Sequence, residues 1–297
     1  MPPWSSFEPF IPIGLAAGGI YALSAVGLVV LYRATGVLNL AFGAIGAMGA
    51  LLAWSMINQA GLPQGLAYVV CILFGGVVNL VYGMVFGRLL AGRDPLVKAT
   101  ATLGLALLML GVMQLLWPAQ ITRSLYLSTD NGGFNVGSVS IDWTQLIAII
   151  FGLVVTIGMG LFLRFTKLGT TMRALADDRE ITATLGVPVR RVEAAAWFGT
   201  GLLAGAAGLL LADLVTLEAD GLTFLVIFTV SAALIGRLQS LAVTYIAAMV
   251  IGVVDNLLAP ITSIANYRDM TPFVLAVIAL LVMARGRQFS FSRGGLR

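Results

Sequence analysis

Long apolar stretches, each close to the length of a membrane-spanning helix, follow one another along the chain with short polar connections between them. Charged residues, prolines and polar clusters delimit nine of these stretches: residues 11–32, 41–58, 65–87, 99–117, 144–163, 194–212, 222–236, 240–258 and 271–284. The seventh is too short for a straight crossing, which predicts a broken helix packed against its neighbours and gives eight as the alternative count. We therefore expect an all-α polytopic membrane protein with eight to nine transmembrane helices, forming one domain over residues 1–297.

The composition supports a membrane protein and excludes several other classes. Hydrophobic residues make up 59% of the chain and charged residues 10%, against about 25% charged in an average soluble domain. The chain has no histidine and a single cysteine, Cys71, so the usual zinc, haem and iron–sulfur ligand sets and an internal disulfide are excluded. We expect no metal site, no cofactor and no nucleic-acid partner, since the net charge of +4 is typical of basic membrane loops.

The distribution of basic residues predicts the orientation. If the N-terminus is outside and all nine stretches cross, 15 of the 17 lysines and arginines fall in inside loops, and only Arg123 and Arg268 fall outside. Loops on the cytoplasmic side are enriched in lysine and arginine. The sequence therefore predicts an outside N-terminus and an inside C-terminus.

Two connections are long enough to have a role of their own. Residues 118–143 form an outside loop, whose Thr129–Gly133 turn signals favour a structured surface loop over a contact for a soluble partner. Residues 164–193 form an inside segment with a predicted amphipathic helix over about 170–185, closed by Gly186 and Pro188. Its apolar stripe comprises Met172, Leu175, Ala176, Ile181 and Leu185. Because acidic residues in the middle of this helix oppose binding to anionic lipid, we favour docking in a groove of another protein.

Polar side chains within the apolar stretches are the candidates for a solute path, because such groups are costly in lipid. They are Asn39, Asn79, Thr100, Thr102, Gln114, Asp255 and Asn256. For Asn79 and Gln114 we favour interhelical hydrogen bonds over ligand contact. Asn39 follows a break signalled by Thr35 and Gly36, and broken helices at membrane depth often line a cavity, so its amide is expected to face the path. Capping of the next helix is an equally good explanation of Asn39.

The chain lacks the sequence motifs of an autonomous ATP-driven machine. It contains no G-x-x-x-x-G-K-[ST] phosphate loop, and without histidine it has no Ser-His-Asp triad. Its spaced glycines, Gly43, Gly46 and Gly49 and then Gly201, Gly205 and Gly208, lie inside apolar stretches and predict close helix packing, not nucleotide binding. We therefore expect a chain that is not an enzyme and depends on energy from elsewhere.

Several segments in a fixed order resemble the Liv-type permeases, the membrane subunits of branched-chain amino acid ABC importers. The resemblance starts with GIYALSAVG (residues 19–27) and YRATGVLNLAFG (residues 32–43) and covers nearly the whole chain. It continues with ATLGL (101–105), with Leu168-Gly169, Arg173-Ala174, Asp177-Asp178 and Leu185-Gly186-Val187, and ends with GRLQS (236–240) and Tyr267-Arg268-Asp269.

The resemblance implies a multi-pass permease domain of the bacterial inner membrane, with a cytoplasmic coupling segment at 164–193 and a periplasmic loop at 118–143. It implies four kinds of partner: a second, related permease subunit in a heterodimer, two ATPase subunits that carry ATP and Mg²⁺, a periplasmic substrate-binding protein, and membrane lipid. The translocation path would involve Asn39, Phe42, Thr100, Thr102 and Asp255. ATPase coupling would involve Gly169, Met172, Arg173, Leu175, Asp177, Asp178 and Gly186.

Three positions depart from the family pattern and leave the solute open. Phe42 replaces a common histidine, Ala44 replaces a common acidic residue, and Asp255 replaces a common glutamate. Relatives of the same fold import urea, short amides or other amino acids. The sequence thus favours import of branched-chain amino acids or a related small polar metabolite by alternating access. The alternatives are an autonomous secondary transporter or channel and, with less support, a membrane-embedded enzyme.

Overall fold

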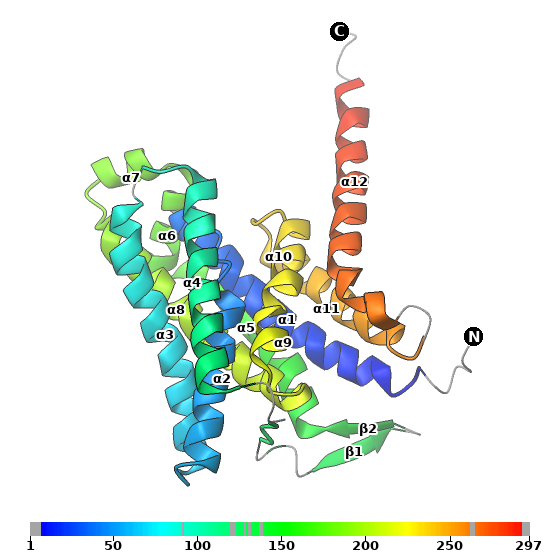
Figure 1. The fold of residues 1–297 in the computed structure, drawn as a ribbon. Helices are drawn as coiled ribbons and strands as arrows, with labels where there is room; N and C mark the ends of the chain where they lie inside the picture. The colour runs from blue at the N-terminus through cyan, green and yellow to red at the C-terminus, as the bar shows by residue number, and fades with distance from the viewer. Residues whose placement is uncertain are drawn as a thin grey trace.

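Helices make up most of the computed structural model, which describes residues 7–90, 92–118, 123–127, 129, 132–136, 139–261 and 265–292 (Figure 1). The longer helices are α1 (Phe10–Thr35), α2 (Phe42–Asn58), α3 (Gln64–Leu89), α4 (Pro95–Leu116), α5 (Trp143–Phe165), α8 (Val189–Leu214), α11 (Leu241–Leu258) and α12 (Thr271–Ser292). The shorter ones are α6 (Lys167–Asp177), α7 (Arg179–Thr184), α9 (Ala219–Thr223), α10 (Leu225–Ile235) and the 3₁₀ turn η2 (Ala265–Met270). The all-α expectation is confirmed apart from one small hairpin.

Each of the nine apolar stretches forms helix, and the lengths divide them into two groups. Within the described residues, α1, α3, α4, α5, α8 and α11 are each long and apolar enough to cross a bilayer. The stretches at Phe42–Asn58, Ala219–Ile235 and Thr271–Val282 form shorter apolar helices. The structure thus supports a polytopic membrane protein, whereas the count of eight to nine crossings and the orientation of the termini stay predictions.

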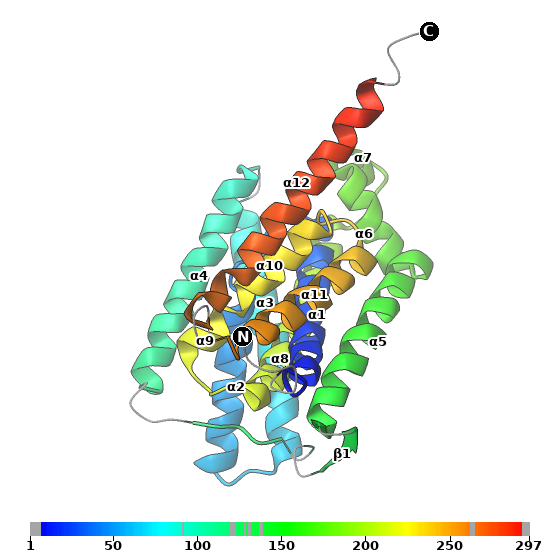
Figure 2. The ribbon, with the colours of Figure 1, turned by 90° about the vertical axis from the view of Figure 1, so that its right-hand side faces the viewer.

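Helix α1 lies at the centre of the bundle (Figures 1 and 2). Nearly all of its residues from Gly14 to Leu31 are buried, and α11, α8, α5 and α10 pack around it. A helix that is apolar on all sides is expected to be surrounded in this way. The core of the molecule is therefore built around one helix instead of between two layers.

Glycines let the helices approach each other closely, as the sequence predicted. A Cβ at Gly208 of α8 would overlap the backbone of Gly46 in α2, and a Cβ at Gly201 would overlap the backbone of Gly75 in α3. Gly43, Gly49 and Gly205 have similar close neighbours in α9, α3 and α3. Backbone contact of this kind is typical of helix packing in membranes.

The loop over residues 118–143 contains an antiparallel hairpin that the sequence did not predict. Strand β1 (Gly133–Val136) pairs with β2 (Val139–Asp142), and Gly133 lies opposite Asp142. The loop is also fastened to the bundle, because the Leu127 N–H donates to an Asp213 carboxylate oxygen at 2.7 Å and the Arg123 guanidinium lies over the Trp54 ring. Part of the predicted turn, Asp130 and Asn131, lies outside the described residues.

Two predicted helices are interrupted. The seventh apolar stretch is broken at Phe224 into α9 and α10, as its short length indicated. The predicted single helix over 170–185 is wrong, because α6 ends at Asp177 and α7 starts at Arg179. Asp178 has extended backbone angles, and its carboxylate accepts a hydrogen bond from the Ile181 N–H at 2.9 Å. The N-cap of a new helix thus replaces a continuous one.

Candidate functional site

The predicted path residues lie in two separate places. Asn39 and Thr102 lie where the segment between α1 and α2 passes α4, and Phe42 follows at the start of α2, whereas Asp255 lies near the end of α11 beside a cavity. Thr100 is exposed, and its hydroxyl donates to the Val97 carbonyl of its own helix. The structure therefore does not bring the predicted set together as one site.

Asn39 is held in a buried polar cluster. Its amide nitrogen donates to Asn79 Oδ1 at 2.9 Å, and its own Oδ1 accepts from the Ala41 N–H at 3.0 Å just before α2. Asn79 in turn donates to the Trp197 carbonyl at 2.7 Å and to Thr200 Oγ1 at 3.2 Å. The interhelical hydrogen bond expected for Asn79 is confirmed. A path role for Asn39 stays a prediction, because these bonds already account for its amide.

Two neighbours of Asn39 have structural contacts of their own. Thr102 Oγ1 accepts from the Leu40 N–H at 2.9 Å and lies 3.1 Å from the Leu38 carbonyl, so it ties α4 to the segment before α2. Phe42 is 1% exposed, and its ring fills the space beside Gly27 of α1. Gln114 also makes the expected interhelical bond, donating to an Asp220 carboxylate oxygen at 3.1 Å.

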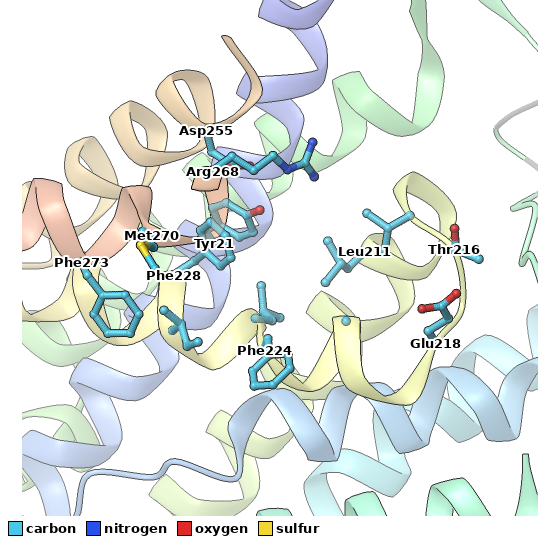
Figure 3. A pocket seen from close by; sticks show the side chains of 14 residues that line it. Tyr21, Leu211, Thr216, Glu218, Phe224, Phe228, Asp255, Arg268, Met270 and Phe273 are labelled. Atoms are coloured by element: carbon cyan, nitrogen blue, oxygen red, sulfur yellow. The ribbon is translucent and has the colours of Figure 1, made fainter. Parts of the chain in front are cut away.

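A cavity of about 560 Å³ lies beside Asp255 (Figure 3). Its walls come from the middle of α1, the chain after α8, helices α9 to α11, η2 and the start of α12. Helices α8 and α11 both begin next to basic residues, at Arg190 and after Arg237, so the segments that follow them lie at the opposite end of the bundle. The cavity therefore extends from mid-bundle toward the end away from the basic loops.

The cavity combines charged groups with apolar walls. Figure 3 shows Asp255, Arg268 and Tyr21 gathered at one end, and Thr216 and Glu218 at the other, with Leu211 and Phe224 between them. Asp255 is 3% exposed, and the Tyr21 ring stacks on Phe228 at a centroid distance of 4.5 Å. A small solute with both a charged and an apolar part would find partners here.

Sequence reasoning found Asp255 but missed the other charged residues of this cavity. Tyr21 and Arg268 both lie in segments that carry the family resemblance, and Arg268 is one of the two basic residues that fall on the predicted outside. That placement was the available signal for Arg268. The sequence contains no such signal for Glu218, because this residue lies in a short connection between a long helix and a broken one.

The predicted coupling residues divide into a buried and an exposed set. Met172 is 3% and Leu175 6% exposed, and both pack within the chain against a cluster that includes Val30, Leu31 and Leu163. The expectation that the apolar stripe docks in a groove of another protein is therefore wrong for these two residues. Gly169 is also buried, against the backbone of Phe162 and Leu163.

The exposed set is what another protein can reach. Of the predicted coupling residues it comprises Arg173, Asp177, Asp178 and Gly186, and Ile181 and Leu185 of the predicted apolar stripe are exposed beside them. Ile181 is 59% and Leu185 77% exposed, and Gly186 ends this region with a left-handed backbone, φ +82°. Apolar side chains flanked by charges suit a shallow protein groove.

Comparison with known proteins places the whole chain in one group. Residues 10–285 match the family described as branched-chain amino acid transport system / permease component. The chain is 25% identical to the high-affinity branched-chain amino acid transport system permease protein LivH of Escherichia coli K12, over 92% of both chains. It is 24% identical to the permease protein BraD of Pseudomonas aeruginosa over the same shares, and 26% identical to the fructose import permease protein FruG of Bifidobacterium longum over 59% of this chain and 51% of that one. The chain therefore belongs to the family of permease components of branched-chain amino acid transport systems, and is a multi-pass protein of the inner membrane.

Proposed function

We propose that this chain is one permease subunit of an ATP-driven importer, and that its solute is a branched-chain amino acid or a related small polar metabolite. The observation that carries the proposal is the match over residues 10–285 to permease components, with relatives such as LivH aligned over 92% of both chains. This match favours an ABC permease over an autonomous secondary transporter or channel. It also favours a transport subunit over an enzyme.

The energy for transport would come from partner chains. The sequence contains no phosphate loop, so ATP and Mg²⁺ would be held by two cytoplasmic ATPase subunits. The exposed surface of α6 and α7, with Ile181 and Leu185 at its apolar centre, is where they would dock. A periplasmic binding protein would deliver the solute, and a second, related permease subunit would complete the membrane part.

The solute would enter through the cavity beside Asp255. This cavity lies toward the end of the bundle away from the basic loops, which is the side predicted to face outward. ATP binding would move α6 and α7, and with them the ends of α1 and α5, on which α6 packs. The path would then be in equilibrium between an outward-open and an inward-open state, and the partner ATPases would shift this equilibrium.

Reconstitution tests this function directly. The chain, its neighbouring-gene permease and ATPases are placed in proteoliposomes with the binding protein, and uptake of labelled leucine is measured. We expect uptake that requires both ATP and the binding protein. Asp255→Asn should reduce uptake at least tenfold in assembled complexes, while Asp220→Asn, at a carboxylate that is bonded to Gln114 and does not line the cavity, should leave it unchanged. Leucine uptake by this chain without ATPases would contradict the proposal.

A further inference from the structure

A second cavity lies at the basic end of the bundle and takes no part in the proposed path. Its volume is about 380 Å³, and its walls come from the end of α1 and the residues after it, the C-terminal part of α3, the N-terminal parts of α4 and α8, and α7. Lys98, Arg179, Glu180 and Glu193 all line it. None of these residues lines the cavity beside Asp255.

Three aromatic rings form the inner wall of this cavity. Tyr82 stacks on Phe86 with ring centroids 4.7 Å apart, and its ring also contacts Trp197 at 5.6 Å. Tyr82 is only 6% exposed, and its hydroxyl is buried without a hydrogen-bond partner in the described part of the chain. Buried hydroxyls are nearly always paired, so a missing partner requires an explanation. A ligand that accepts a hydrogen bond from Tyr82 supplies one.

The charges around this wall have both signs. Lys98 and Arg179 are cationic, Glu180 and Glu193 are anionic, and Arg179 pairs with Glu193 at the cavity edge, where their side chains are 51% and 19% exposed. The four charges sum to zero. Such a site is complementary to a small neutral molecule that carries one carboxylate and one ammonium group.

We propose that this cavity binds a small zwitterion with an apolar side chain, that is, an aliphatic amino acid present on the inner side of the membrane. Lys98 and the Tyr82 hydroxyl bind its carboxylate, Glu180 or Glu193 binds its ammonium group, and Phe86 and Trp197 cover its side chain. This assignment rests on the proposed function only in taking the bound molecule to be the transported solute.

Occupation of the site would restrain α7. Arg179, Glu180 and Ala183 of α7 form one wall of the cavity, while the opposite walls belong to the bundle. A ligand between them links α7 to α3 and α8. Because α7 and the turn after it carry Ile181 and Leu185 of the docking surface, the accumulated solute would slow its own import.

Hydrogen exchange locates the binding without relying on transport. The assembled complex in nanodiscs is compared with and without millimolar L-leucine. We expect exchange in residues 179–185 to slow several-fold in the wild type and in Tyr68→Phe. Tyr68 is the matched control, because it lies on the same helix and its hydroxyl donates to Gln64 at 3.1 Å. Tyr82→Phe removes only an unpaired hydroxyl and Lys98→Gln only a charge, so both should fold and both should lose the protection.

Two analogues test the ligand class. 4-Methylpentanoate lacks the ammonium group and 3-methylbutylamine lacks the carboxylate, so neither should protect α7 as leucine does. Equal protection by either analogue, protection that persists in Tyr82→Phe and Lys98→Gln, or no protection by leucine would overturn the proposal.

Uptake measurements then distinguish a failure of this proposal from a failure of the proposed function. In proteoliposomes preloaded with leucine, initial uptake should fall several-fold for the wild type and Tyr68→Phe but not for Tyr82→Phe. Protection of α7 in a complex that imports no leucine would contradict the proposed function and leave this site standing. Import that ignores internal leucine would overturn the feedback.

Discussion

Asn79 joins three parts of the bundle through one side-chain amide. It accepts from Asn39, donates to the backbone of Trp197 in α8, and lies within hydrogen-bond distance of Thr200. It is fully buried, so none of these bonds can be replaced by water. The pair of Asn39 and Asn79 therefore determines how the segment before α2 lies against α3 and α8.

Replacement of Asn39 by leucine should lower stability. The change removes the bond to Asn79 and the bond from the Ala41 N–H, and it leaves buried polar groups without partners. Such a loss lowers the free energy of unfolding by about 1–3 kcal/mol. Thermal unfolding of the purified complex measures it, with Asn58→Leu as the control, since among the described residues Asn58 is bonded only to the Trp54 carbonyl of its own helix. A stable Asn39→Leu complex that fails to transport would instead assign Asn39 to the path.

Glycine positions on one helix should differ sharply in their tolerance of a larger side chain. A Cβ at Gly208 meets the backbone of Gly46, whereas a Cβ at Gly199 of the same helix meets nothing within 4 Å. Gly208→Val should therefore separate α2 from α8 and lower the free energy of unfolding by about 1–3 kcal/mol or more. Gly199→Val should leave the free energy of unfolding nearly unchanged. Yield and thermal unfolding of the two variants compare them. Equal behaviour would contradict the packing of α2 on α8.

At the scale of elements, the apolar stretches predicted helix positions well because burial in lipid or in the bundle needs only a continuous run of apolar residues. The ends of α5 and α11, for example, lie within two residues of the predicted ones. The break at Asp178 and the hairpin at Gly133–Asp142 were missed. The break depends on a side-chain cap and the hairpin on the pairing of two four-residue strands, and neither leaves a periodic signal.

The candidate site was less predictable than the fold. Asp255 could be identified because a carboxylate in an apolar stretch is unusual. Its neighbours Tyr21 and Arg268 come from α1 and η2, more than 200 residues apart, and only the tertiary arrangement brings them to one cavity. The same holds for Met172 and Leu175, whose partner surface comes from α1, α5 and α8.

The docking surface can now be tested with sharper variants. Ile181→Glu and Leu185→Glu change exposed side chains of α7 and the turn after it, so the chain should insert and fold normally but retain less ATPase on co-purification. Met172→Glu should act differently, because a buried charge against α1 lowers the yield of the permease itself. Thr184→Glu, which is exposed but polar in the wild type, serves as the control for added charge. Full ATPase recovery with both Ile181→Glu and Leu185→Glu would exclude α7 as the docking element.

At the scale of the whole molecule, the two cavities lie toward opposite ends of one bundle. The cavity beside Asp255 is bounded by segments that follow α8 and α11, and the cavity beside Tyr82 by segments next to Arg88, Lys98 and Arg190. Under the proposed function, the asymmetry of the basic residues would correspond to a functional asymmetry. Solute would enter at the less basic end. At the basic end the ATPases would dock, and solute accumulated on the inner side would bind.

The number of crossings depends on where the loop after α10 lies. If the broken stretch α9–α10 crosses, this loop is on the cytoplasmic side, and if it does not, the loop is outside and only eight crossings remain. The Arg33 guanidinium donates to the Gln239 carbonyl at 3.3 Å. Because Arg33 is in the last turn of α1, this contact joins the loop to the end of α1 that is predicted to be cytoplasmic. We therefore predict nine crossings.

Cysteine labelling in intact cells tests this topology with little background, because Cys71, the only native cysteine, is fully buried. Ser140→Cys in the exposed part of β2 should react with a reagent that cannot cross the inner membrane. Gln239→Cys and Arg173→Cys, both at exposed positions, should react only after the membrane is made permeable. Reaction of Gln239→Cys in intact cells would reduce the number of crossings to eight. Each later connection would then change sides, so the connection that carries Arg268 would lie in the cytoplasm. Reaction of Arg173→Cys there would reverse the whole orientation and exchange the roles of the two cavities.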